Sequence, residues 1–161
     1  MVEQRTHKPL VGGSNPPAGT IIHHPHPVPI FHDCQRCTAC CRWPGQVRLT
    51  EAEIARLAAF KGVSEHDFIQ QFTRLTPDRR GLALLDKPNG ECIFLEGESC
   101  AVQPVKPQQC RDFPNLWHYP GAEKFCRATP REVGADEYLR LVTAATGRMP
   151  EEISAIINRK S

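Results

Sequence analysis

The sequence lacks the long apolar runs and the one-sided charge that mark membrane and nucleic-acid-binding proteins. No apolar stretch approaches the roughly 18–20 residues that span a bilayer, so no membrane association is indicated. The 20 basic and 18 acidic residues leave a formal net charge of +2, which does not indicate nucleic acid as a partner. Residues 1–29 contain no continuous apolar segment of the kind that a secretory signal peptide carries. We therefore expect a cytoplasmic protein whose thiols stay reduced.

Familiar catalytic motifs are missing as well. Gly12 and Gly13 have neither a neighbouring Lys nor a following helix, so they do not form a phosphate-binding loop. There is no Gly-x-Ser-x-Gly elbow, and the Cys-x-x-x-Cys-x-x-Cys spacing typical of radical S-adenosylmethionine enzymes does not occur. No catalytic residue is therefore assigned, and the reaction, if there is one, stays open.

What the chain does contain is an unusual group of eight cysteines, all between residues 34 and 126. They are Cys34, Cys37, Cys40, Cys41, Cys92, Cys100, Cys110 and Cys126. The first four form Cys-x-x-Cys-x-x-Cys-Cys, and gaps of two residues let two sulfurs reach one metal ion. Four cysteines within eight residues rarely arise for packing alone. We predict that all eight are metal ligands, for zinc ions or an iron–sulfur cluster.

The spacing leaves the number of sites open. Adjacent side chains usually point apart, so Cys40 and Cys41 indicate either two different sites or one spare thiol. Eight thiols can fill two four-ligand sites, one [4Fe–4S] cluster with four others, or one site with several bystanders. A helix over residues 34–41 would place its four sulfurs on one side, and a loop can bring them together equally well.

Several other side chains are candidates for supporting roles. Four arginines lie beside cysteines, where their charge would offset the thiolates and lower the thiol pKa values. They are Arg36, Arg42, Arg111 and Arg127. Trp43 and Trp117 flank the two cysteine regions and are expected to seal them from water. Asp112 is a candidate for orienting Arg111, and His118 is either an auxiliary ligand or a packed histidine.

The 15 prolines and 11 glycines predict many turns and short elements. Thr50 and Glu53 form a capping-box pattern that begins a helix ending at Gly62, and Ser64 begins another. Apolar runs at 82–85 and 92–95, separated by Asn89-Gly90, predict a β-hairpin.

Further along the chain, a single helical turn is expected near Cys110. Two amphipathic helices are expected over Asp136–Thr146 and Pro150–Asn158, with Gly147 ending the first and Pro150 beginning the second. The fold class predicted is a small α+β protein stabilised by metal, with short helices and a β-hairpin around the cysteines. We divide it into a disordered Pro/His-containing tail (1–30), a metal-binding domain (31–128) and a C-terminal helical extension (129–161). The histidines at 23, 24 and 26 are interpreted as part of the solvated tail rather than as ligands.

The order of these motifs resembles the YkgJ-like CxxCxxCC cysteine-cluster family, which is described as a zinc- or iron-chelating domain. The matching residues are the first four cysteines, Cys92-Ile-Phe-Leu, Cys100 and Lys106-Pro107-x-x-Cys110-Arg111-Asp112-Phe113-Pro114. Many members have Arg-Pro where this chain has Lys106-Pro107, which keeps the charge but loses the bidentate guanidinium. The resemblance covers roughly residues 31–126 and implies metal chelation without a particular reaction.

The predicted function is therefore metal binding, with metal ions as the partners and no protein partner assigned. Two alternatives stay open. One is an iron–sulfur oxidoreductase. The other is an accessory factor for protein modification, because a related cysteine pattern in flagellin lysine N-methylases implies that the module can accompany methylation.

Overall fold

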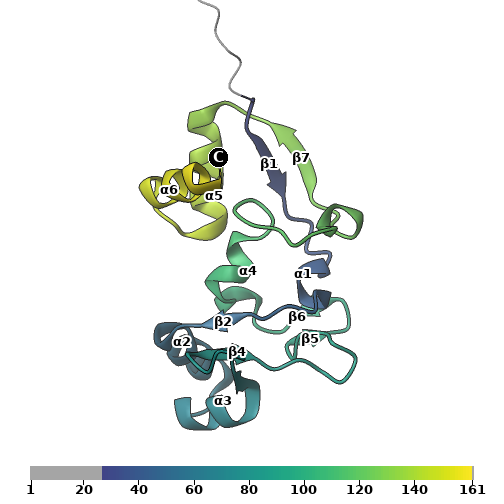
Figure 1. Cartoon of the computed structure of the whole chain (residues 1–161), viewed down its shortest axis with the longest axis vertical. Helices are drawn as coiled ribbons and strands as arrows, with labels where there is room; N and C mark the ends of the chain where they lie inside the picture. Colours follow the sequence, from purple (N-terminus) through teal and green to yellow (C-terminus); the bar gives the residue numbers. More distant parts are fainter. Residues whose placement is uncertain (1–26, 161) are drawn as a thin grey trace, which may run out of the picture.

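The computed structural model describes residues 27–160, which fold into the predicted small α+β protein (Figure 1). Most of the predicted tail, including His23, His24 and His26, lies outside the described residues; its last residue, Ile30, begins strand β1 (Ile30–Asp33). Short elements prevail because turns and prolines interrupt the chain. No helix within 27–160 combines the length and the apolar character needed to cross a bilayer.

The first half of the chain builds a small sheet covered by two helices. Strands β2 (Arg48–Leu49), β4 (Leu82–Leu84) and β3 (Thr73–Leu75) pair antiparallel in that order. Helices α2 (Glu51–Lys61) and α3 (Glu65–Phe72) lie against it at the lower end of Figure 1.

Local chemistry sets the ends of these two helices. Thr50 and Glu53 form the predicted capping box, Gly62 ends α2 with φ 69°, and the Ser64 hydroxyl accepts from the Asp67 amide to begin α3. Their apolar faces bury Leu57 and Phe68 with Leu84 and Phe94 from the other side of the core. The predicted helices are thus confirmed.

The hairpin predicted between residues 82–85 and 92–95 forms only next to its turn, and residues 82–84 pair with other strands. Strand β4 is the central strand of its sheet, so β2 and β3 already occupy both of its edges. The part that forms has its turn at Gly90 (φ 84°), a bridge between Asp86 and Cys92, and backbone hydrogen bonds from Lys87 to Glu91 at 2.7 Å and from Ile93 to Leu85 at 3.1 Å. The hairpin that does form joins β5 (Leu95–Glu96) to β6 (Ser99–Cys100), and it carries Cys100.

The second half of the chain packs on its beginning. Strand β1 pairs antiparallel with β7 (Thr129–Glu132), and helices α5 (Ala135–Thr146) and α6 (Pro150–Lys160) cover that ribbon at the upper end of Figure 1. Their shared core includes Phe31, Val142 and Ile153. The β1–β7 pairing crosses the division proposed at residue 128, and that division stays a prediction.

A short helix, α4 (Gln108–Asp112), connects the two halves and confirms the helical turn predicted near Cys110. On one side the Gln108 amide donates to Glu53 Oε1 at 2.6 Å. On the other, Arg148 donates to both carboxylate oxygens of Asp112 at 2.9 and 2.8 Å. Asp112 therefore holds Arg148 and does not orient Arg111, because the Asp112 carboxylate already has a bidentate partner in the turn after α5.

Candidate metal centre

The first cysteine motif is mostly a loop. Only Ala39–Arg42 form a helix, α1, so the helical alternative for residues 34–41 is wrong. Arg36 (φ 52°) and Thr38 (φ 61°) adopt the left-handed conformation on either side of Cys37. These two residues break the helical path, and Cys37 bonds with the Cys126 thiol while Cys40 bonds with the Cys41 thiol, although the charge of Cys40 still acts on Cys37.

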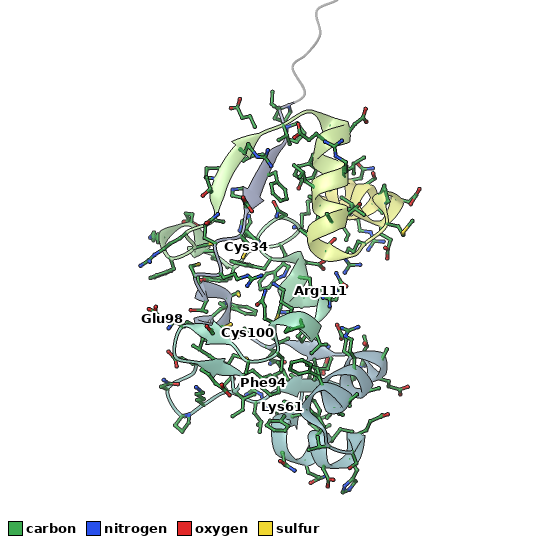
Figure 2. The ribbon with its side chains drawn as sticks, turned by 180° about the vertical axis from the view of Figure 1, so that it is seen from behind. Cys34, Lys61, Phe94, Glu98, Cys100 and Arg111 are labelled. Carbon is green, nitrogen blue, oxygen red and sulfur yellow. The ribbon has the colours of Figure 1, made fainter. Side chains whose placement is uncertain are left out.

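Five sulfurs gather between the two halves of the molecule, and we call them the inner sulfur group. They are Cys40 and Cys41 from α1, Cys92 from the bridge, Cys100 from β6 and Cys110 from α4. The segments are tied directly, since the Cys92 amide donates to the Cys41 carbonyl at 2.7 Å. Figure 2 shows Cys100 at this level, with Cys34 above it.

The adjacent Cys40 and Cys41 do not point apart as expected. The Cys41 thiol donates hydrogen bonds to the sulfurs of both Cys40 and Cys100. These bonds favour ionised acceptors, so the pKa of Cys100 falls to about 6 and that of Cys40 to about 7. The pKa of Cys41 is raised, because it is the donor to two sulfurs.

Lysine supplies the positive charge next to this group. Lys106 lowers the thiol pKa values of Cys40 and Cys100 and partly offsets the effect of burial on Cys110. Burial is the larger effect at Cys92 and Cys110, where it raises the pKa of the thiol. The inner sulfur group therefore mixes two acidic thiols with buried thiols that resist ionisation.

The arginines expected to offset the sulfur charge have other roles. Arg42 pairs with Glu91 at 3.3 Å, and Arg111 donates to the carbonyls of Lys106 and Pro104 at 3.1 and 3.4 Å. Arg127 acts through its backbone, whose N–H donates to Cys37 Sγ at 3.3 Å. Lys106 is instead the cation whose charge lowers the pKa values of inner thiols.

The remaining cysteines, Cys34, Cys37 and Cys126, form an outer sulfur group. The Cys126 thiol donates a hydrogen bond to the Cys37 sulfur, and negative charge on Cys34 raises the pKa of Cys126. Burial raises the pKa of Cys37, but backbone amides of Arg127 and Ala39 and the Cys126 thiol outweigh it and lower the pKa. Cys34 itself is exposed.

Aromatic side chains pack between the two groups. The rings of Phe113 and Tyr119 stack at 5.8 Å, Trp43 stacks on Tyr119 at 5.7 Å, and Trp117 contacts Phe113 at 5.3 Å. One inner thiol, Cys40, and one outer thiol, Cys126, pack against this cluster. Within the first cysteine motif, the boundary between the outer and the inner group therefore falls between Cys37 and Cys40, and not between Cys40 and Cys41.

Backbone amides are directed at sulfurs in both groups. In four cases the donor is the N–H two residues further along the chain. The pairs are Ala39 to Cys37, Phe94 to Cys92, Val102 to Cys100 and Ala128 to Cys126. Such bonds stabilise the anionic form of a sulfur and hence the form that binds metal.

The donor set fits a thiophilic metal, although the ligands are not yet in place around an ion. Within residues 27–160, no three Cys, His, Asp or Glu side chains surround one point as metal ligands do. Three of the five inner thiols, Cys40, Cys41 and Cys100, instead share hydrogen bonds, and all eight cysteines are free of disulfides. A ligand set made only of sulfur suits zinc or an iron–sulfur cluster. Binding would replace the thiol–thiol hydrogen bonds.

Two histidines approach the outer group without joining it. His118 is exposed, and with His32 and Cys126 it lines a cavity of about 380 Å³. The auxiliary-ligand role for His118 stays a prediction.

Sequence reasoning missed two positioning contacts. Glu53 was predicted as a helix cap, but its second carboxylate oxygen also accepts from Gln108 and so holds the helix that carries Cys110. The Tyr119 hydroxyl donates to the Ala39 carbonyl at 3.4 Å, which ties the aromatic cluster to α1. No local pattern signals either contact, because the partners are more than 50 residues apart.

Comparison with known families agrees with this donor set. A family model named CxxCxxCC and described as "Putative zinc- or iron-chelating domain" matches residues 33–139, a range that includes all eight cysteines. No solved structure matches the chain. Because the family model covers most of the sequence, the chain belongs to the CxxCxxCC family of zinc- or iron-chelating domains.

Proposed function

We propose that this protein binds zinc or iron through the inner sulfur group. The observation that carries the proposal is the meeting of five thiols from four separate segments beside one lysine. Apolar packing of these five thiols would not require the positively charged Lys106 side chain beside them. Family membership supports chelation in general, and the gathered thiols suggest which part of the chain performs it.

Four of the five inner thiols suffice for a tetrahedral zinc ion or a [4Fe–4S] cluster. We assign Cys40, Cys92, Cys100 and Cys110 as these ligands and Cys41 as a hydrogen-bond donor beside them. Cys41 is the thiol that gives its hydrogen to two neighbours, so it is the natural one to stay protonated. Four thiolates leave two negative charges on a zinc ion, and Lys106 offsets part of them.

The test is to purify the full-length protein without oxygen from cells supplied with both zinc and iron. Elemental analysis and a visible spectrum then identify the metal, since zinc is colourless and an iron–sulfur cluster absorbs visible light. We expect the Cys110→Ser variant to lose most of the metal. The matched Cys34→Ser variant alters an exposed outer thiol and is expected to keep it. Metal-free wild-type protein, or full metal content in Cys110→Ser, would contradict the proposal.

An iron–sulfur redox function is the second candidate. The observation that favours it is the fifth thiol: Cys41 lies within hydrogen-bonding distance of Cys40 and Cys100 and is available as an exchangeable ligand. An accessory role in protein modification rests on the family resemblance alone. We also propose a reducing compartment, the cytoplasm, which the eight free thiols favour.

A further inference from the structure

A cleft of about 800 Å³ opens beside the outer sulfur group. Three arginines from separate parts of the chain line it: Arg36 before Cys37, Arg42 at the end of α1, and Arg127 after Cys126. The four ligands proposed above, Cys40, Cys92, Cys100 and Cys110, are not among the residues that line this cleft.

The charge in the cleft is positive and partly unpartnered. Within residues 27–160, the side chains of Arg36 and Arg127 have no ion pair and no hydrogen bond, and both residues are exposed. Arg42 shares its charge with Glu91, and Glu98 is the acidic residue that lines the cleft. Two free guanidinium groups at one cavity favour a ligand with oxygen-centred negative charge, because a guanidinium binds carboxylate or phosphate with two parallel hydrogen bonds.

One wall of the cleft is aromatic and fixed. Trp43 lies nearly parallel to Tyr119, with an interplanar angle of 14°. A side chain at Gly45 would meet the Trp43 ring at 1.9 Å, so the ring rests directly on the Gly45 backbone. Phe125, another lining residue, is 66% exposed. Because the Trp43 ring is covered by Tyr119 and Gly45, Phe125 is the lining aromatic side chain that offers open apolar surface to a planar ligand beside the positive charge.

The backbone around Cys37 is held in an uncommon conformation at this cleft. Arg36 and Thr38 are two of the three non-glycine residues with positive φ among those described. Such strain persists where the surrounding structure enforces it, and it is concentrated at binding sites. Here it places the Arg36 side chain and the Cys37 thiol at the same cavity.

We propose that this cleft binds a small organic anion that carries a carboxylate or phosphate group and a planar body. The anionic group lies among Arg36, Arg42 and Arg127, and the planar body lies against Phe125 beside the Trp43 wall. The volume suits a single small molecule, since ligand cavities of this kind measure about 300–1,000 Å³. This binding goes beyond metal chelation and does not require it.

The test titrates phenyl phosphate and benzoate into the full-length protein, whose metal content is measured separately. Tryptophan fluorescence and NMR shifts of the Trp43 indole and Ala39 amide report binding. Phenol supplies the ring without charge, and inorganic phosphate supplies the charge without a ring. We expect phenyl phosphate or benzoate to bind, phenol to bind at least tenfold more weakly than either, and added salt to reduce the affinity.

Two variants test whether the anion binds at this cleft or is attracted by positive charge anywhere on the protein. The Arg36→Gln/Arg127→Gln double variant should raise the Kd at least tenfold, whereas Arg140→Gln, which removes an exposed arginine on α5, should change it less than twofold. Far-UV circular dichroism and metal content are expected to stay unchanged in all of them, because neither cleft arginine has a side-chain partner.

Three outcomes would overturn the proposal. The first is that neither organic anion binds. The second is that inorganic phosphate or phenol binds as tightly as phenyl phosphate. The third is that the double variant keeps wild-type affinity. If the double variant fails to fold, the wild-type NMR map decides: shifts centred away from Trp43 and Ala39 would overturn the assignment, and shifts at them would support it. If the wild-type protein purified without oxygen contains no metal but binds the anion, the proposed chelation is overturned and this inference stands.

Discussion

Replacing Glu53 with glutamine should weaken both the fold and the metal centre. The Glu53 carboxylate is 6% exposed and accepts from the Thr50 amide at 2.8 Å and from the Gln108 amide at 2.6 Å. Glutamine keeps one acceptor oxygen but loses the charge and the second oxygen. Its NH2 group also replaces the oxygen that accepts from one of the two backbone N–H groups, so that N–H loses its acceptor.

The cost can be worked out from these contacts. A lost helix cap costs about 1 kcal/mol, and a lost hydrogen bond to a charged group costs about 1.5–3 kcal/mol. Because glutamine retains part of the network, we expect the free energy of unfolding to fall by roughly 1.5–3 kcal/mol. Gln108 begins the helix that carries Cys110, so metal affinity should also fall, by about tenfold, as it does when groups behind a ligand are removed.

The assay is urea unfolding of the metal-loaded protein, with metal affinity measured by competition against a chelator. Glu51→Gln is the matched control, because Glu51 occupies the first turn of the same helix but is exposed, and its side chain has no hydrogen bond or ion pair among residues 27–160. We expect that control to stay within about 0.5 kcal/mol of wild type. A Glu53→Gln variant as stable as Glu51→Gln would refute the bridging role that we assign to this carboxylate.

Three further outcomes are expected. Arg148→Gln removes both hydrogen bonds to the largely buried Asp112 and should lower the free energy of unfolding by about 2–4 kcal/mol, measured against Arg159→Gln. Lys106→Gln removes a charge that lowers the pKa of Cys100. In chelator-treated protein the pH midpoint for alkylation of Cys100 should therefore move upward from about 6. An unchanged midpoint would show that the Lys106 charge does not affect the Cys100 pKa. A strong chelator should lower the thermal midpoint of the loaded protein, because metal binding energy is folding energy, and an unchanged midpoint would argue against a structural metal.

The features that the sequence predicted well are those decided by neighbouring residues. The capping box at Thr50, the stop at Gly62 (φ 69°) and the stop at Gly147 (φ 76°) each depend on a few adjacent backbone groups. The cysteines could likewise be recognised as candidate ligands from the sequence, because four of them fall within eight residues.

The features that were missed depend on distant partners. Strand β4 took β2 and β3 as neighbours in place of residues 92–95, and Asp112 took Arg148 in place of Arg111. The division of the sulfurs depends on two left-handed residues, Arg36 and Thr38, whose side chains give no local sign of that conformation. Spacing therefore identified the candidate ligands but not how they are grouped.

The inner sulfur group explains why a cation belongs among these thiols. Burial, and after it the negative charge of neighbouring sulfurs, opposes ionisation at Cys92 and Cys110, while Lys106 and the Cys41 thiol favour ionisation of Cys100 and Cys40. One ammonium group cannot balance four thiolates in a partly buried space. At the site that we propose, a metal ion would supply the missing charge by direct bonding, which would remove the remaining thiol protons. Metal uptake there would release protons, chiefly from the two buried thiols, and the apparent affinity would rise with pH until those thiols ionise unaided.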